Sequence, residues 1–239
     1  MKLLNSALND FKTIIFIDFE GTQTSQEIIA IGAVKCDIDA KNQVKKTYNG
    51  FKVFVKAKNK IGPIITRLTG ITEPLLKEQG VSFEVALNKL HKYIGTNLNV
   101  KFLSYGSFDL RLVHQTSSLN GMERHPIVQA FNKNNIDFAS IFQHYVKSSK
   151  HEQLSLIDGL KLFKITPIEG IHDPITDSRN LILLYQACLN NKKILQEEYK
   201  KLIVADPHLP KPVAKAITKL VKDGNLNKKE FDKYIEEDV

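Results

Sequence analysis

The sequence predicts an α/β layer fold built on a mixed central sheet. Three strand-like segments follow one another near the start of the chain, and the rest alternates between strand-like and helical patterns. Consecutive strands with short connections indicate an antiparallel meander. Strands that alternate with helices indicate helical layers packed against a sheet, which is the α/β class.

The three consecutive strands are expected at residues 13–19, 27–38 and 48–56. The first, TIIFIDF, is a short run of β-branched and aromatic residues, which is typical of a buried strand. A turn at Gly21 leads to the second, EIIAIGAVKCDI, and the polar stretch DAKNQVKK is expected to form a hairpin loop before the third, YNGFKVFVK. Together these segments would form the meander.

The middle of the chain is expected to be mostly helical. The segment IITRLTGI predicts one or two helical turns closed by Gly70, and residues 82–94 predict a helix capped by Ser82. A further strand is expected at residues 100–106, followed by a helix with Asp109 in its first turn. Two more helices are expected in the segments IDFASIFQHYVK and QLSLIDGLKLF.

The segment DPITDSRNLILLYQACL predicts a long helix, capped by Asp173 and with Pro174 at its first position. Beyond about residue 190 the composition changes to lysine-rich helix with proline breaks. We therefore expect one α/β domain over residues 1–189 and a C-terminal helical extension over residues 190–239.

The composition describes a globular protein with an excess of positive charge. The chain has 239 residues, a formal net charge of +8 and an isoelectric point near 9.3. The excess fits either a solvated lysine-rich surface or attraction to a polyanion such as nucleic acid. Cys36 and Cys188 have neither a disulfide nor a zinc-ligand spacing, and no secretory or membrane-spanning segment is evident. A cytoplasmic location away from the membrane is the resulting expectation.

The extension contains a strongly amphipathic helix, PVAKAITKLVKDG, that Gly224 would end. Asn227 and Glu230 then fit the capping box of a second helix. We expect the apolar side of the first helix to pack on the α/β domain or on a second subunit. The second case would make the protein a homo-oligomer. Its lysines would face solvent, either simply solvated or holding the phosphates of a nucleic acid.

Four acidic residues and one histidine recur in a fixed order along the chain: Asp18, Glu20, Asp109, His172 and Asp177. Taken singly, each is an ordinary strand-end acid, helix-start acid or loop histidine. Together they follow or adjoin apolar segments whose ends can meet at one sheet edge. Clustered carboxylates repel one another and are tolerated mainly beside a hard divalent cation such as Mg²⁺ or Mn²⁺, while histidine accepts protons near neutral pH. The set predicts a two-metal site that cleaves phosphodiesters.

Three motifs carry a resemblance to a known family: IDFEGT, SYGSFDL and HDPITDSRN, with an LTGI element between the first two. In this order they resemble the DEDDh 3′–5′ exonucleases, the superfamily of ribonuclease T and of the proofreading subunit of bacterial replicative polymerase. The resemblance covers roughly residues 11–188. The sequences RLTGIT and EIIAIGAV are most similar to those of the branch that trims the 3′ ends of structured or small RNAs.

The resemblance implies an RNase-H-like fold and a role for each residue of the set. Asp18, Glu20 and Asp177 would hold the first of two Mg²⁺ or Mn²⁺ ions, and Asp18 would bridge to the second. Asp109 would complete the metal site, partly through water, and His172 would accept the proton of the attacking water.

The resemblance also implies contacts with a single-stranded substrate that has a free 3′ end. Thr22 and the backbone of Gly21 would contact the terminal nucleotide, and Leu68 and Phe108 would pack on its base unless they belong to the core. The expected reaction is release of nucleoside 5′-monophosphates from the 3′ end, with RNA favoured. A DNA proofreading or repair exonuclease is the alternative, and a binding module without turnover is a third hypothesis.

Overall fold

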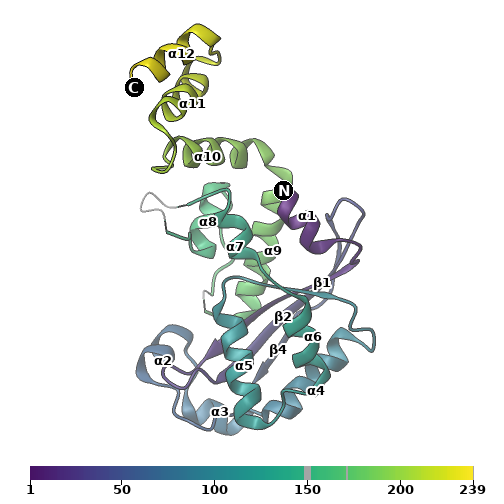
Figure 1. Cartoon of the computed structure of the whole chain (residues 1–239). Coiled ribbons are helices and arrows are strands. Elements are labelled where there is room, and N and C mark those ends of the chain that lie inside the picture. Colours follow the sequence, from purple (N-terminus) through teal and green to yellow (C-terminus); the bar gives the residue numbers. More distant parts are fainter. Residues whose placement is uncertain (148–151, 171, 239) are drawn as a thin grey trace. The chain divides into compact units, whose positions relative to one another are not determined.

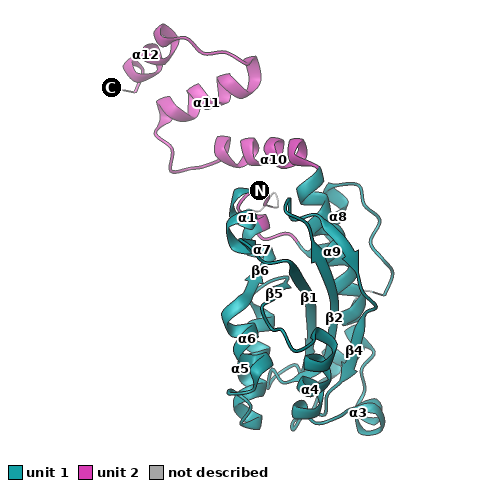
Figure 2. Cartoon of the chain, turned by 90° about the vertical axis from the view of Figure 1, so that its right-hand side faces the viewer, with its two compact units in different colours: residues 1–141, 155–190 teal, residues 142–154, 191–239 magenta. Residues whose placement is uncertain are grey.

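The computed structural model describes residues 1–147, 152–170 and 172–238. The chain divides into two compact units, residues 1–141 with 155–190 and residues 142–154 with 191–239 (Figure 2). Residues 142–154 thus group with the C-terminal unit, although the sequence placed them in the first domain. Whether each unit is a domain that folds by itself stays a prediction.

The first unit contains a mixed central sheet, as the sequence predicts (Figure 1). It has six strands, two more than the sequence predicts. The strand order is β3-β2-β1-β5-β6, and β4 also pairs with β2. The pairs that β2 makes with β1, β3 and β4 are antiparallel, whereas β1 with β5 and β5 with β6 are parallel. The strands are β1 (Thr13–Gly21), β2 (Ile28–Ile38), β3 (Val44–Thr47), β4 (Phe51–Phe54), β5 (Lys101–Ser104) and β6 (Asn135–Asp137).

Nine helices of the described chain accompany this sheet. Six of them lie in segments that the sequence predicts to be helical, and three were not predicted: Lys2–Leu8, Glu73–Gln79 and Pro126–Asn134. Ser82 caps the fourth of them, and Gly70 ends the second in the left-handed conformation. The nine are α1 (Lys2–Leu8), α2 (Pro63–Thr69), α3 (Glu73–Gln79), α4 (Phe83–Ile94), α5 (Phe108–Asn120), α6 (Pro126–Asn134), α7 (Phe138–Gln143), α8 (Leu156–Leu162) and α9 (Pro174–Asn190).

Two strands lie where the sequence predicted something else. The stretch expected to be a hairpin loop contains β3, whose residues VKKT lie mostly exposed along β2, so no apolar alternation marks it. The segment expected to begin a helix contains β6, which is three residues long and turns directly into α7. Its short parallel pairing with β5 is a long-range interaction that local periodicity does not reveal.

Helices cover both faces of the sheet. Ile15, Ile17 and Phe19 of β1 join a buried cluster with apolar residues of α4, α5 and α6. Phe16, which points the other way, packs edge-to-face on Tyr185 of α9, with ring centroids 5.3 Å apart. Because successive side chains of a strand alternate between faces, the sheet lies between α4–α6 and α9 (Figure 2).

A close approach between β2 and α9 positions the start of that helix. Gly32 of β2 pairs with Asp18 of β1, and a Cβ atom on Gly32 would overlap the backbone carbonyl of Pro174. The hydroxyl of Ser178 donates to the carbonyl oxygen of Gly32 at 3.1 Å and to that of Pro174 at 2.8 Å. Only glycine fits at position 32. Because Gly32 has no side chain, the first turn of α9 can lie against the sheet beside Asp18.

In the part of residues 191–239 that the structure describes, the second unit forms three helices: α10 (Lys192–Val204), α11 (Lys211–Asp223) and α12 (Lys228–Glu236). The predicted helix end at Gly224 and the capping box of Asn227 and Glu230 are both confirmed. Among the described residues, no helix is long and apolar enough to cross a membrane.

Two lysines of α11 form surface ion pairs. Lys215 lies 2.7 Å from Glu237, and Lys219 lies 2.9 Å from Asp223 and 3.4 Å from Glu230. Ion pairs at the surface contribute little energy, so the predicted role of these lysines stays a prediction. The apolar Leu220 and Val221 of the same helix are exposed, so their packing on a second subunit stays a prediction.

Replacing Gly32 with alanine should destabilise the protein and displace the first turn of α9. The added methyl group would meet backbone rather than a flexible side chain, so we expect the upper part of the usual overpacking cost, about 3 kcal/mol. For a chain of this size that corresponds to a fall in Tm of roughly 10 °C. Thermal unfolding followed by circular dichroism measures it.

Gly70→Ala is the matched control, because that site has a positive φ of 71° but open space around a Cβ atom. It should cost only backbone strain, about 1 kcal/mol. Equal destabilisation by the two variants would contradict the steric account of Gly32.

Candidate active site

Asp18 and Glu20 lie at the carboxyl end of β1 on the same face of the strand, because they are two residues apart. Both side chains are half-buried. The regular pairing with β2 shifts between Glu20 and Gly21, which ends the strand there. A Cβ atom on Gly21 would collide with the side chain of Leu112 in α5, so this strand end and α5 are in close contact.

Asp109 reaches the same place from the first turn of α5. It is 4 % exposed, and its Oδ1 accepts a hydrogen bond from the backbone N–H of Phe19 at 3.3 Å. The turn before α5 contains Gly106 with a φ of 111°, and the Gly106 N–H donates to Asp137 at 2.9 Å. The turn that begins α5 is therefore fixed to the end of β6.

Asp177 and His172 come from the start of α9. Asp173 caps the helix as predicted, because its Oδ1 accepts from the N–H groups of Ile175 and Thr176 at 3.0 and 3.2 Å. The N–H of His172 donates to Oδ2 of Asp177 at 2.9 Å, and His172 has a positive φ of 67°. Its imidazole is exposed to solvent.

The structure therefore brings all five predicted residues to one edge of the sheet. One ligand atom from each of Glu20, His172 and Asp177 lies within 4.8 Å of the others. Asp18 is close enough to Asp109, Glu20 and Asp177 for their charges to act on it directly. Their assignment as metal ligands and proton acceptor stays a prediction that this geometry supports.

The electrostatics of the cluster are unfavourable for four ionised carboxylates. Burial, followed by the charges of Asp177 and Asp109, raises the pKa of Glu20 to about 8. Burial raises the pKa of Asp109 to about 8 and that of Asp177 above its usual range, in each case against hydrogen bonds that lower it. Burial and the neighbouring carboxylates, Asp109 foremost, also raise the pKa of Asp18.

The donor set suits a hard divalent cation. It consists of carboxylate oxygens with one imidazole at the rim, and Mg²⁺ and Mn²⁺ prefer oxygen ligands. A bound cation would remove the repulsion that raises these pKa values, so the cluster and the cation fit each other. The residues that would hold it are Asp18, Glu20, Asp109 and Asp177.

The residues predicted to contact the substrate differ in their exposure to solvent. Leu68 of α2 is 47 % exposed and Phe108 of α5 is 40 % exposed, so neither belongs to the core. Thr22 is 1 % exposed, and its hydroxyl accepts from the N–H of Glu27 at 2.9 Å. Gly21 is buried as well. A contact between Thr22 and a nucleotide therefore requires that internal hydrogen bond to open.

The structure adds residues near the site that the sequence analysis did not single out. Lys52 of β4 forms an ion pair with Asp173, the cap of α9, and so joins that helix start to the sheet. Asp137 holds the turn before α5, and its charge contributes to the raised pKa of Asp109. No local pattern distinguishes these residues from ordinary surface charges, because each acts through a partner that is distant in sequence.

Glu27 is a third such residue, in the turn that follows the carboxylates of β1. It is buried, and its carboxylate accepts from the N–H groups of Lys58 and Asn59 and from the hydroxyl of Ser25. Although burial acts in the opposite direction, these hydrogen bonds lower the pKa of Glu27. It therefore remains ionised and joins the loop after β4 to the loop after β1.

A mixed sheet between helices, with acidic side chains gathered at the end of its central strand, defines a nuclease of the RNase-H-like class. The comparison with protein families makes this specific: the chain belongs to the RNase_T exonuclease family, whose profile matches residues 15–185. This range contains all five residues of the cluster. Membership in the DEDDh 3′–5′ exonuclease superfamily follows, and with it nucleic-acid binding. A search of curated proteins finds no match to the sequence.

Solved structures confirm the fold. The nuclease domain of 3′hExo bound to rAMP is 20 % identical with a TM-score of 0.61, and the match covers 77 % of this chain and 94 % of that one. Cell-death related nuclease 4 (CRN-4) has the same identity and TM-score, with 75 % and 64 % covered. Exonuclease I of E. coli in complex with a dA16 oligonucleotide is 13 % identical with a TM-score of 0.57, with 78 % and 42 % covered. At these identities the likeness shows the fold.

The metal-free protein should lose stability as pH rises from about 5 to 8. The pKa of Glu20 is about 8 in the folded state and near 4.5 in the unfolded state. Between these two values the folded state therefore binds more protons than the unfolded state. Stability therefore falls as those protons leave. Mg²⁺ should raise Tm at pH 8 much more than at pH 5, because the cation needs deprotonated ligands.

Differential scanning fluorimetry with chelator or Mg²⁺ across this pH range measures the effect. Glu20→Gln should flatten the pH dependence, whereas Glu78→Gln, an exposed position on α3, should leave it unchanged. A metal-free Tm that rises between pH 5 and 8 would overturn the electrostatic account.

Proposed function

We propose that this protein is a two-metal 3′–5′ exonuclease that releases nucleoside 5′-monophosphates from single-stranded nucleic acid, with RNA as the favoured substrate. The observation that carries the proposal is the convergence of Asp18, Glu20, Asp109 and Asp177 at one sheet edge. Their raised pKa values call for a compensating cation. Such a site has no evident structural purpose, because burying like charges costs stability.

The bound ions would stabilise charge on the attacking and leaving oxygens of the phosphodiester. The protein's own side chains would hold the cations and accept the proton. The charges of Asp109 on α5 and of Asp177 on α9 both act on Asp18, so these carboxylates would hold the cations together. His172, exposed at the rim and tied through its backbone to Asp177, would accept the proton of the attacking water.

Two exposed apolar side chains support attack at a chain end. Leu68 and Phe108 are solvent-exposed on α2 and α5, and the guanidinium of Arg111 lies 5.3 Å from the centre of the Phe108 ring. Exposed apolar and aromatic groups of this kind pack on unstacked bases. They would hold a terminal base while the phosphodiester behind it lies at the carboxylates.

The choice between RNA and DNA rests on weaker support. A structural neighbour is a 3′-exonuclease that recognises a histone mRNA stem-loop, and 3′hExo was bound to rAMP. Exonuclease I was bound to DNA oligonucleotides. Together with the RLTGIT and EIIAIGAV segments, the first two favour RNA, and a DNA proofreading or repair exonuclease is the alternative. A binding module without turnover is disfavoured because all five positions of the cluster are filled.

The protein should shorten single-stranded oligonucleotides from the 3′ end in the presence of Mg²⁺ or Mn²⁺. Matched RNA and DNA substrates labelled at the 5′ end should yield a ladder of shorter products, with RNA degraded faster, and chelator should stop the reaction. Gel electrophoresis and chromatography of the released nucleotides measure this. Cleavage of a circular single strand, or persistent activity in excess chelator, would refute the proposal.

Replacing His172 with alanine should lower kcat about 10²- to 10⁴-fold, the usual effect of losing a general base. Oligonucleotide affinity measured in chelator should change little, because the carboxylates remain. Asp18→Asn should abolish turnover, since the bridging ligand is lost. His114→Ala is the control, because His114 is exposed on α5 and bonded to Asn132. Wild-type turnover by His172→Ala at neutral pH would show that another group accepts the proton.

A further inference from the structure

The second unit contains a cavity of about 630 Å³ that includes none of the residues of the carboxylate cluster. Its walls are the segment from Gln143 to Lys147, the last turns of α10 and the turn at residues 205–208. This volume is typical of sites for small organic ligands. All three segments belong to the same compact unit, so the cavity is a property of that unit.

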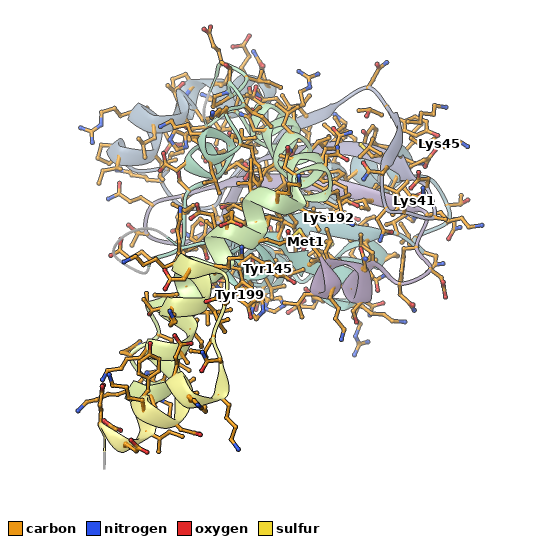
Figure 3. All side chains as sticks on the ribbon, turned by 90° about the horizontal axis from the view of Figure 1, so that it is seen from above. Met1, Lys41, Lys45, Tyr145, Lys192 and Tyr199 are labelled. Atoms are coloured by element: carbon orange, nitrogen blue, oxygen red, sulfur yellow. The ribbon has the colours of Figure 1, made fainter. Side chains whose placement is uncertain are left out.

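An ordered aromatic group forms one wall. Tyr199 of α10 is 36 % exposed, and two rings brace it. The imidazole of His144 lies 5.5 Å away at an interplanar angle of 33°, and the ring of Tyr145 lies 5.6 Å away at 65°. Figure 3 labels Tyr145 and Tyr199. A ring held by its neighbours yet open to solvent is a preorganised surface for a planar ligand.

One cationic side chain, Lys147, also lines the cavity and suits an anionic group on the ligand. Lys147 is exposed, and among the residues that the structure describes no carboxylate lies within ion-pair distance of it. The carboxylate in the wall, Asp206, accepts a hydrogen bond from the N–H of His208 at 2.9 Å within its own turn. Leu202 and Ile203 supply apolar surface between these groups.

We propose that this cavity binds an unpaired nucleotide of a single-stranded nucleic acid, with its base stacked on Tyr199 and its phosphate beside Lys147. A base with a phosphate is the ligand class that combines a planar ring with negative charge, and stacking plus cationic contacts is how single strands are held without sequence preference. The site binds and does not cleave, so it is a second contact in addition to the carboxylate cluster.

Equilibrium binding in chelator tests the proposal without relying on cleavage. The full chain is titrated into a 5′-fluorescent, single-stranded 20-mer, and anisotropy gives Kd. Tyr199→Ala should raise Kd about tenfold, within the range known for loss of one base–aromatic stack. Tyr199→Phe should bind as the wild type does, because the ring remains. Lys147→Gln should lower the salt slope by about 0.7, the value for one phosphate of a single strand.

Lys193→Gln is the matched control for Lys147, since Lys193 is exposed on the same unit and outside the cavity. It should leave Kd and the salt slope unchanged, and melting curves for every variant check that folding is intact. Photocrosslinking with a bromouracil-containing 20-mer should modify the peptide that contains Tyr145 or Tyr199.

An unchanged Kd for folded Tyr199→Ala would overturn the proposal, and so would equal losses in Tyr199→Phe and Tyr199→Ala. The first result is also the one expected if the cavity instead takes an acidic peptide. A protein that binds in this way but does not degrade 3′ ends would refute the exonuclease proposal and leave this one standing.

Discussion

The contact between the first turn of α9 and β2 determines whether the carboxylate cluster exists. Asp18 and Glu20 are in place once β1 forms, but Asp177 and His172 arrive only because Gly32 lets a helix start lie directly on the sheet. The hydroxyl of Ser178, the cap at Asp173 and the ion pair from Lys52 all act on that same turn. The packing of one helix end thus decides the position of two of the five residues.

This packing brings negative charges together at a cost in stability. Buried carboxylates that raise each other's pKa destabilise a fold at neutral pH unless something binds them. Elsewhere the chain satisfies a buried acid by hydrogen bonding, as at Glu27, whose pKa is lowered. The contrast between the two groups of acids is informative, because the hydrogen bonds at the end of β1 do not offset burial and repulsion there, whereas a bound cation would.

The sequence predicted the sheet class, the strands of the meander that carry apolar side chains, and the helices that have clear caps at Ser82 and Asp173. It also named the residues that the structure gathers at the sheet edge, because their order along the chain resembles a known family. It missed β3 and β6, since exposed lysines and a three-residue strand carry no periodic signal. Lys52 and Glu27 were missed for a related reason: their partners lie 121 and 31 residues away.

Direct titration of Mn²⁺ into the metal-free protein at pH 8, followed by electron paramagnetic resonance and calorimetry, tests the central claim that the cluster exists to hold divalent cations. The account predicts two bound ions per chain in the wild type and loss of both, or retention of one with weakened affinity, in Asp18→Asn. Asp39→Asn, which changes an acid of the β2–β3 hairpin, should bind as the wild type does. The absence of saturable Mn²⁺ binding, or binding unaffected by Asp18→Asn, would contradict the account.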